Sequence, residues 1–274
     1  MPLDKLRLVR LAQELNLVVG MTGDGVNDAP ALKRADVGFA MGSGTEVAKE
    51  AGDIVILDDN FLSIKQAILY GRTIYNNIRK FIVFQLTINF AAVMTSFVAP
   101  FLGIDKPLTI TQILWINLVM DTLAALAFGG EPALASYMQE QPKQRGAAIV
   151  STNMLRQIIL FGSIMTLIGL AFFTSSWVDG LFRNAPDHIY TYTGFFSAFI
   201  CMAVANAFNV RSKSLNVLQN MQANPAFIQV MLLIVALLVG LTSFGGQLLR
   251  AAALSAQVWV VVAVAAAATL GVGS

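Results

Sequence analysis

The chain has 274 residues, of which 56% are hydrophobic and only 12% are charged, and its mean hydropathy is +0.68. This composition argues against a wholly soluble protein. The net charge of +2, without runs of basic residues, argues against nucleic-acid binding, and the single cysteine, Cys201, cannot form a disulfide framework. Because 20 of the 34 charged residues lie in the first 80 positions, we expect a charged head followed by a membrane body.

The first sixty residues alternate between patterns typical of strands and of short helices. The predicted strands are Leu15–Val19, Val37–Met41 and Asp53–Leu57, and the predicted helices are Asp28–Ala35 and Thr45–Ala51. This alternation predicts a parallel sheet of α/β type. Three strands are fewer than the about five or six of a common open sheet, so we expect the chain to be the C-terminal part of a longer protein.

From about Phe61 the pattern is helical, with no proline before Pro100, and six apolar segments of about 20 residues follow, long enough to cross a bilayer. The predicted spans are 81–103, 107–130, 157–178, 188–210, 226–249 and 251–274. We therefore expect a mixed fold. A partial α/β segment occupies residues 1–60, a cytoplasmic stalk helix residues 61–80, and an all-α bundle of six transmembrane helices residues 81–274.

The basic residues of the short loops predict the orientation in the membrane, because cytoplasmic loops carry an excess of lysine and arginine. Those on the side of the head are Arg72, Arg79, Lys80, Lys143, Arg145, Arg156, Arg211 and Lys213, and those on the opposite side are Lys106, Arg183 and Arg250. An even number of spans places both termini on one side. We therefore expect both termini to be cytoplasmic.

The densest motif of the head is TGDGVNDAP, residues 22–30. It places Asp24 and Asp28 at the carboxyl end of a predicted strand, where open α/β sheets bind their ligands. Carboxylate oxygens are the ligands that Mg²⁺ prefers, commonly together with substrate phosphates and water. The spacing fits equally well an Asp/Gly/Asn turn whose side chains bond their own backbone.

Three polar residues within the predicted spans are candidate cation ligands. Asp121 is the only acidic residue deep within a span, and a lone carboxylate there costs at least about 2.5–3.5 kcal/mol by insertion scales. Asn117 precedes it by four positions, which places both side chains on one face of a regular helix. Asn89 offers an amide oxygen in the first span. Carboxylate and amide oxygens suit Ca²⁺, whereas for Asn89 alone hydrogen bonding between helices is the favoured interpretation.

The head and the spans together resemble a known family. The stretch TGDGVNDAPALKRADVGFAMGSGTEVAKEAGDIVILDDNF resembles the phosphorylation-domain segment of P-type cation-transporting ATPases, which belong to the haloacid-dehalogenase-like phosphotransferases. The resemblance continues through YGRTIYNNIRKF, FQLTINFAAV and ILWINLVMDTLAALA and covers essentially the whole chain. Within the family the chain looks most like the plasma-membrane-type calcium pumps.

The resemblance implies roles for individual residues of the head. Asp24 matches the Mg²⁺-ligating aspartate of the family, and Asn27 and Asp28 match residues that support the phosphoryl group and the metal. Lys5 matches a lysine that contacts the aspartyl phosphate, where a cation offsets the charge of the transferring phosphoryl group. Without the resemblance, Lys5 reads as an ordinary surface lysine.

In the membrane, the resemblance maps Asn89, Asn117 and Asp121 onto ligands of the transported cation. Ala92 and Ala203 stand where two-site calcium pumps carry acidic side chains, which implies a single ion site.

The D-K-T-G-T motif that carries the phosphorylated aspartate, and the nucleotide-binding domain that binds ATP, are absent from the chain. We therefore expect the chain to be inactive alone. The function implied is the C-terminal part of an ATP-driven Ca²⁺ pump of the cell membrane, working with the lipid bilayer and with N-terminal pump domains. The alternatives are an orphan membrane fragment without enzymatic activity, or a pump for another cation such as Mn²⁺, Na⁺ or H⁺. A membrane-tethered phosphatase ranks below both.

Overall fold

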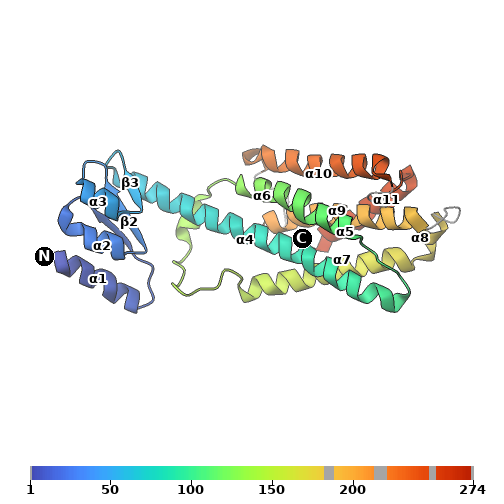
Figure 1. Ribbon diagram of the computed structural model, residues 1–274, viewed down its shortest axis with the longest axis horizontal. Helices are drawn as coiled ribbons and strands as arrows, with labels where there is room; N and C mark the ends of the chain where they lie inside the picture. The colour runs from blue at the N-terminus through green and yellow to red at the C-terminus, as the bar shows by residue number, and fades with distance from the viewer. Residues whose placement is uncertain (1, 182–187, 213–220, 247–250, 273–274) are drawn as a thin grey trace. The chain divides into compact units, whose positions relative to one another are not determined.

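The computed structural model describes residues 2–181, 188–212, 221–246 and 251–272 (Figure 1). It divides into two compact units. The first comprises residues 1–75 and 133–149, and the second comprises residues 76–132 and 150–274.

The first unit contains a parallel sheet of three strands in the order β1-β2-β3. The strands are β1 (Gly20–Gly23), β2 (Val37–Met41) and β3 (Ile54–Ile56), and the helices are α1 (Pro2–Glu14), the 3-10 turn η1 (Val26–Asp28), α2 (Ala29–Arg34) and α3 (Glu46–Ala51). In register, Gly20 pairs with Val37 and Phe39 pairs with Ile54. Because parallel neighbours need a crossover connection, α2 and α3 lie between successive strands in the sequence.

The central strand β2 carries the small core of this unit on both of its faces. Ala40 packs with Leu32 and Ala48, whereas Phe39 packs with Ile56 and Ile64. Successive residues of a strand point to opposite faces, so this alternation covers the sheet above and below.

The strand prediction is confirmed for Val37–Met41 and wrong for Leu15–Val19, because pairing begins only at Gly20. The chain leaves α1 through Asn16, whose φ of +59° turns the backbone. Leu17 and Val18 are then 52% and 47% exposed and reach no neighbouring strand. The third strand, Ile54–Ile56, is two residues shorter than predicted; just before it, Asp53 donates its amide to the Gly38 carbonyl and accepts from the Gly38 amide through its side chain, each at 2.8 Å.

Residues 133–149, which include the 3-10 turn η4 (Ala135–Gln139), belong to the first unit although they follow a membrane span in the sequence. Arg72 Nη1 donates to the carbonyls of Tyr137 and Glu140 at 2.7 and 2.8 Å. Arg145 forms an ion pair with Asp36 at 3.0 Å. Two arginines therefore attach this segment to the unit.

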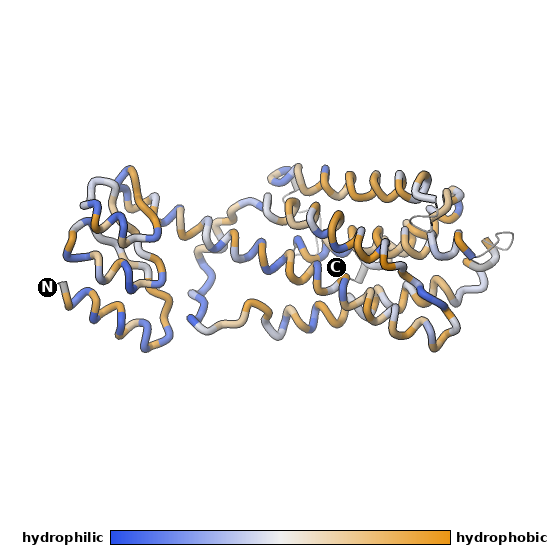
Figure 2. The backbone as a smooth tube through the Cα atoms, viewed as in Figure 1, coloured by the Kyte–Doolittle hydropathy of each residue, from blue (hydrophilic) through white to orange (hydrophobic). Residues whose placement is uncertain are grey.

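The second unit is helical. Its elements are the part of α4 (Phe61–Val98) from residue 76 onward, η2 (Ala99–Leu102), α5 (Ile110–Trp115), the π-helix η3 (Ile116–Met120), α6 (Asp121–Gly129), α7 (Thr152–Thr174), α8 (Ser176–Leu181), α9 (Ile189–Arg211), η6 (Met221–Ala223), α10 (Pro225–Phe244) and α11 (Ala256–Val272). The long helix expected from Phe61 is present as α4. Figure 2 shows that apolar residues dominate these helices.

Five helical segments in the described part of the chain are long and apolar enough to cross a membrane. They are Phe61–Leu102, Ile110–Gly129, Thr152–Thr174, Ile189–Arg211 and Pro225–Phe244. The last predicted span corresponds to α11, which has 17 residues against the roughly 20 that a span needs. Six spans therefore stay a prediction, and three residues counted for the orientation, Arg183, Lys213 and Arg250, lie outside the described residues.

The core of the second unit surrounds α9, the most buried of the five segments. Phe195, Phe196 and Phe199 on this helix are at most 1% exposed. Close approach depends on small residues, as is usual between membrane helices. A Cβ added to Gly169 would lie 2.9 Å from the Phe195 ring, and one added to Gly162 would lie 2.5 Å from the Phe90 ring.

Candidate functional site

The candidate site of the first unit is the loop that follows β1. Asp24 comes directly after the strand, and its carbonyl accepts a hydrogen bond from the Thr45 amide at 2.8 Å. Asp28 folds back over the loop, where its Oδ2 accepts from the amides of Asp24 and Gly25 at 3.2 and 3.4 Å. A Cβ on Gly23 would lie 2.5 Å from the Asp28 Cβ, so only glycine leaves room for this side chain. Asp28 therefore bonds the backbone of its own loop, as a turn residue does, and its role toward a phosphoryl group stays a prediction.

Lys5 of α1 reaches the same loop. Its Nζ donates to Asp28 Oδ1 at 2.6 Å, from a side chain that is 50% exposed to one that is 7% exposed. The hydrogen bond from Lys5, helped by the loop amides, holds the pKa of Asp28 below its usual range despite burial. The structure thus brings Lys5, Asp24 and Asp28 together, while the side chains of Asp24 and Asn27 are exposed.

A Mg²⁺ ion fits this loop through one residue. The Asp24 carboxylate faces solvent at the carboxyl end of β1, and Mg²⁺ keeps several waters and uses one or two carboxylates plus phosphate oxygens. Both oxygens of Asp28 are already engaged. Among the described residues, no group of three or more His, Cys, Asp or Glu side chains gathers as a metal site.

The second unit contains the candidate cation site. Asp121 is 4% exposed, and neither of its carboxylate oxygens receives a hydrogen bond from the described part of the chain. Gln85 of α4 lies near enough to interact with this carboxylate without forming a hydrogen bond of normal geometry. A buried carboxylate that receives no hydrogen bond of normal geometry is costly, so the site favours an additional ligand.

The helix around Asp121 is not regular, so the condition under which Asn117 and Asp121 would share one face is not met. Ile116–Met120 form a π-helix, in which the Asp121 amide donates to the Ile116 carbonyl five residues earlier. Asn117 is exposed whereas Asp121 is buried, so the chain does not place the two side chains on one buried face. Asn89 of α4 is half-buried. Single π-turns within helices frequently occur at functional sites.

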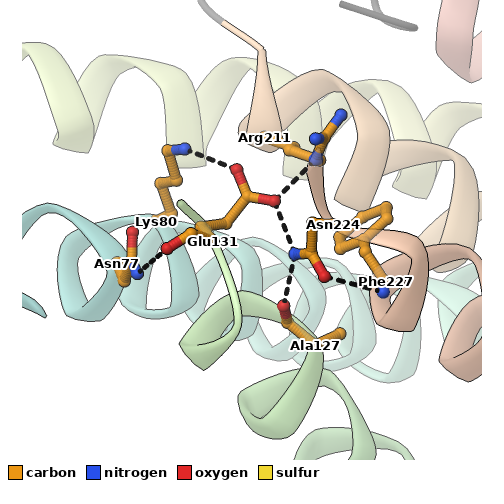
Figure 3. A network of polar contacts seen from close by, with 7 residues as sticks. All are labelled: Asn77, Lys80, Ala127, Glu131, Arg211, Asn224 and Phe227. Atoms are coloured by element: carbon orange, nitrogen blue, oxygen red, sulfur yellow. Dashed lines mark hydrogen bonds and ion pairs between the residues drawn. The ribbon is translucent and has the colours of Figure 1, made fainter. Parts of the chain in front are cut away.

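A buried polar network that no sequence pattern indicated surrounds Glu131, two residues after α6 (Figure 3). Lys80 Nζ lies 3.1 Å from Glu131 Oε2, and Arg211 Nε lies 2.7 Å from Oε1. Asn224 Nδ2 donates to Oε1 at 2.8 Å, and Asn77 Nδ2 donates to the Glu131 carbonyl at 3.2 Å. We call this set of residues the Glu131 network; it comprises Asn77, Lys80, Glu131, Arg211 and Asn224.

Charge and burial explain how the Glu131 network holds together. The side chains of Lys80, Glu131 and Arg211 are 12%, 6% and 2% exposed. Burial alone would raise the pKa of Glu131, but hydrogen bonds from Asn224 and Arg211 and the charges of Lys80 and Arg211 outweigh it and hold the pKa below its usual range. Arg211 also lies over the Phe227 ring, 5.2 Å from its centroid. In the sequence, Lys80, Glu131 and Arg211 could be recognised only as charged residues at or near the ends of predicted spans.

Helices of spanning length, packed around a buried carboxylate, define the chain as a multi-pass membrane protein. A family model described as the C-terminus of cation-transporting ATPases matches residues 105–274, which is more than half of the chain. The chain therefore belongs to the cation-transporting ATPase family. A second model, haloacid dehalogenase-like hydrolase, matches residues 8–68.

Individual relatives agree with the family models. The chain is 40% identical over 275 residues to plasma membrane calcium-transporting ATPase 3 of Homo sapiens, covering 94% of this chain and 22% of the relative. It is 40% identical over 266 residues to calcium-transporting ATPase 9, plasma membrane-type, of Arabidopsis thaliana, covering 94% of this chain and 24% of the relative. The chain thus spans about a quarter of the length of the curated relatives it matches. The resemblance to plasma-membrane-type calcium pumps is confirmed.

Proposed function

We propose that the chain is the C-terminal part of an ATP-driven Ca²⁺ pump of the plasma membrane, with the α/β unit and both termini on the cytoplasmic side. The observation that carries the proposal is the buried Asp121 carboxylate, which follows a π-turn in a spanning helix and receives no hydrogen bond from the described residues. Relatives at about 40% identity are named as calcium-transporting ATPases. In this proposal, α11 serves as the sixth span and the first unit as part of a haloacid-dehalogenase-like domain.

The transported cation would be held by Asp121 together with Asn117 and Asn89. Ca²⁺ takes about six to eight oxygen ligands, so three side chains are not sufficient. Asn117 is exposed in this chain. This exposure supports a site that is completed by a further helix from the N-terminal part of the pump. The exposed amide would be covered there, and that helix would supply the remaining oxygens.

Phosphoryl chemistry would take place at the loop after β1. When bound, Mg²⁺ supplies positive charge that neutralises the transferring phosphoryl group, and Asp24 is the residue here that would hold it. Asp28 fixes the loop by accepting from the amides of Asp24 and Gly25. The half-exposed Lys5 places its ammonium group beside Asp28, at the same loop. Asn27 would contact the phosphoryl group from the loop surface. The phosphorylated aspartate and most of the ATP contacts would come from the N-terminal domains.

Phosphoenzyme formation tests this proposal. The protein to use is a chimera in which this chain replaces the matching segment of human plasma membrane calcium-transporting ATPase 3. We expect Ca²⁺ to stimulate acid-stable labelling from radioactive ATP, and Asp121→Asn to abolish this stimulation. Labelling driven by Mn²⁺, Na⁺ or H⁺ but not by Ca²⁺ would assign a different cation. A correctly folded chimera that no cation labels would support an inert fragment.

A further inference from the structure

The Glu131 network joins four helical elements at one end of the second unit. Asn77 and Lys80 lie on α4, Glu131 follows α6, Arg211 ends α9, and Asn224 caps α10 by accepting from the Phe227 amide at 3.1 Å. Asn224 also donates to the Ala127 carbonyl on α6 at 3.1 Å. Every contact of α6 in the network is therefore made within its last turn or immediately after it.

Contacts along α4 and α6 show that the two helices run antiparallel. Lys80 on α4 contacts Glu131 after α6. Four residues later on α4, the Phe84 ring contacts Phe128, which comes three residues before Glu131, with ring centroids 5.5 Å apart. Continuing in the same directions leads to Asn89 on α4 and to Asp121 at the start of α6. With a rise of 1.5 Å per residue, Asn89 lies about 8 Å beyond Phe84 and Asp121 about 11 Å beyond Phe128, so the two lie at similar depth, about 3 Å apart along the helix axes.

We propose that Glu131 is a positioning residue that fixes the axial register of α4 against α6, and thereby aligns Asn89 with Asp121 at one depth. The register itself follows from the contacts of the network, whereas its consequence for cation affinity rests on the proposed function. Because lipid tails are as apolar as the helix faces, burial of apolar surface alone does not select one register of two spanning helices. The directional contacts of a buried ion pair distinguish the registers.

The chemistry of the network suits this role. Glu131 offers two carboxylate oxygens, of which Oε2 faces α4 through Lys80 and Oε1 faces α9 and α10 through Arg211 and Asn224. A slip of α6 by one turn, about 5.4 Å, would separate all three donors from the carboxylate. The charges of Lys80 and Arg211 would then lose the carboxylate that faces them in a buried site, which is strongly unfavourable.

A distance measurement in the full chain tests the register without reference to transport. Spin labels on Phe97→Cys and Leu126→Cys, at positions 64% and 68% exposed, report the axial offset of α4 and α6 in a Cys201→Ala background. We expect one narrow distance distribution with the native network. With Glu131→Ala, a second population should appear, displaced by up to about one helical turn of 5.4 Å. Thr87→Ala is the matched control, because it removes a buried hydrogen bond to the Val83 carbonyl on α4 outside the network.

If Glu131→Ala does not fold, Lys80→Met decides, since it keeps the Glu131–Arg211 pair and removes the charged link to α4. Unchanged distances in the folded variants would overturn the proposal.

In the chimera described above, both variants should raise the Ca²⁺ concentration for half-maximal phosphorylation about tenfold, equivalent to about 1.4 kcal/mol, and leave the maximal level nearly unchanged. A shifted register with unaltered Ca²⁺ dependence would overturn the positioning role. A chimera without any response to Ca²⁺ would refute the proposed function, and the distances would still decide the register.

Discussion

The ammonium group of Lys5 lies 2.6 Å from the carboxylate of Asp28, although 23 positions separate the two residues. This ion pair fastens α1 to the loop after β1, on which Asp24 is presented to solvent. The pair joins residues that the family resemblance assigned to one phosphoryl site.

The ion pair predicts how stability depends on pH. Because the pKa of Asp28 in the folded chain lies below its ordinary value of 3.8, the pair stabilises the fold above that value and the stabilisation is lost as the pH falls through the lowered pKa. Lys5→Met should cost about 1 kcal/mol or less at neutral pH, since Lys5 is half exposed, and nothing in strong acid. Denaturant titrations of the full chain in detergent at pH 7 and in acid measure this. An equal loss at both pH values would be inconsistent with the predicted linkage.

Gly23 should not tolerate a side chain. The Cβ of Gly23→Ala would lie 2.5 Å from the Asp28 Cβ, so Asp28 must move and lose its contacts with the loop amides and Lys5. We expect a loss of about 1–3 kcal/mol, which is typical of overpacking. Gly25→Ala is the control, because its Cβ would meet nothing closer than 3.9 Å. Limited proteolysis of the first unit within the full chain compares the two variants, and equal sensitivity would argue against the packing described for Gly23.

Arg72 should be required for the attachment of residues 133–149. Its Nη1 donates to two backbone carbonyls of this segment. Because an alanine side chain has no donor, Arg72→Ala removes both hydrogen bonds. Arg72→Ala should therefore speed protease cleavage within 133–149 by about tenfold, corresponding to about 1.4 kcal/mol of local stability. Lys65→Ala on the same helix serves as the control, and the rates of cleavage are read from peptide masses. Identical rates for the two variants would show that other contacts hold the segment.

Asp121→Asn should make the chain more stable while it abolishes any response to the cation. The carboxylate is buried without a hydrogen bond from the described residues, and a neutral amide reduces the cost of burying it. We expect a gain of about 1–3 kcal/mol in detergent without added cation. Asp105→Asn, which changes an exposed aspartate, should have almost no effect. A loss of stability with Asp121→Asn would mean that the native carboxylate has a favourable partner.

Sequence patterns predicted those parts of the fold that depend on local composition. The strand Val37–Met41 was predicted because it is a short apolar run, which suits a strand buried on both faces, and α4 because no proline interrupts it before Pro100. The strand at Leu15–Val19 was misplaced because a single left-handed residue, Asn16, redirects an apolar run. The π-turn at Ile116–Met120 leaves no mark in the spacing of apolar residues.

The candidate site divides in the same way. Lys5, Asp24 and Asp28 could be named from the sequence through a motif, although the ion pair itself could not. The Glu131 network could not be predicted, since its members come from four segments and nothing in their spacing connects positions 80, 131 and 211. Long-range pairs of this kind depend on how the helices pack, which composition does not specify.

The central claim, that Asp121 binds transported Ca²⁺, is tested most directly by uptake of radioactive Ca²⁺ into vesicles that contain the chimera with human plasma membrane calcium-transporting ATPase 3. We predict ATP-dependent uptake with the native chain and with Asp105→Asn, and none with Asp121→Asn. Uptake by the Asp121→Asn chimera at the native rate and with the native Ca²⁺ dependence would contradict the claim.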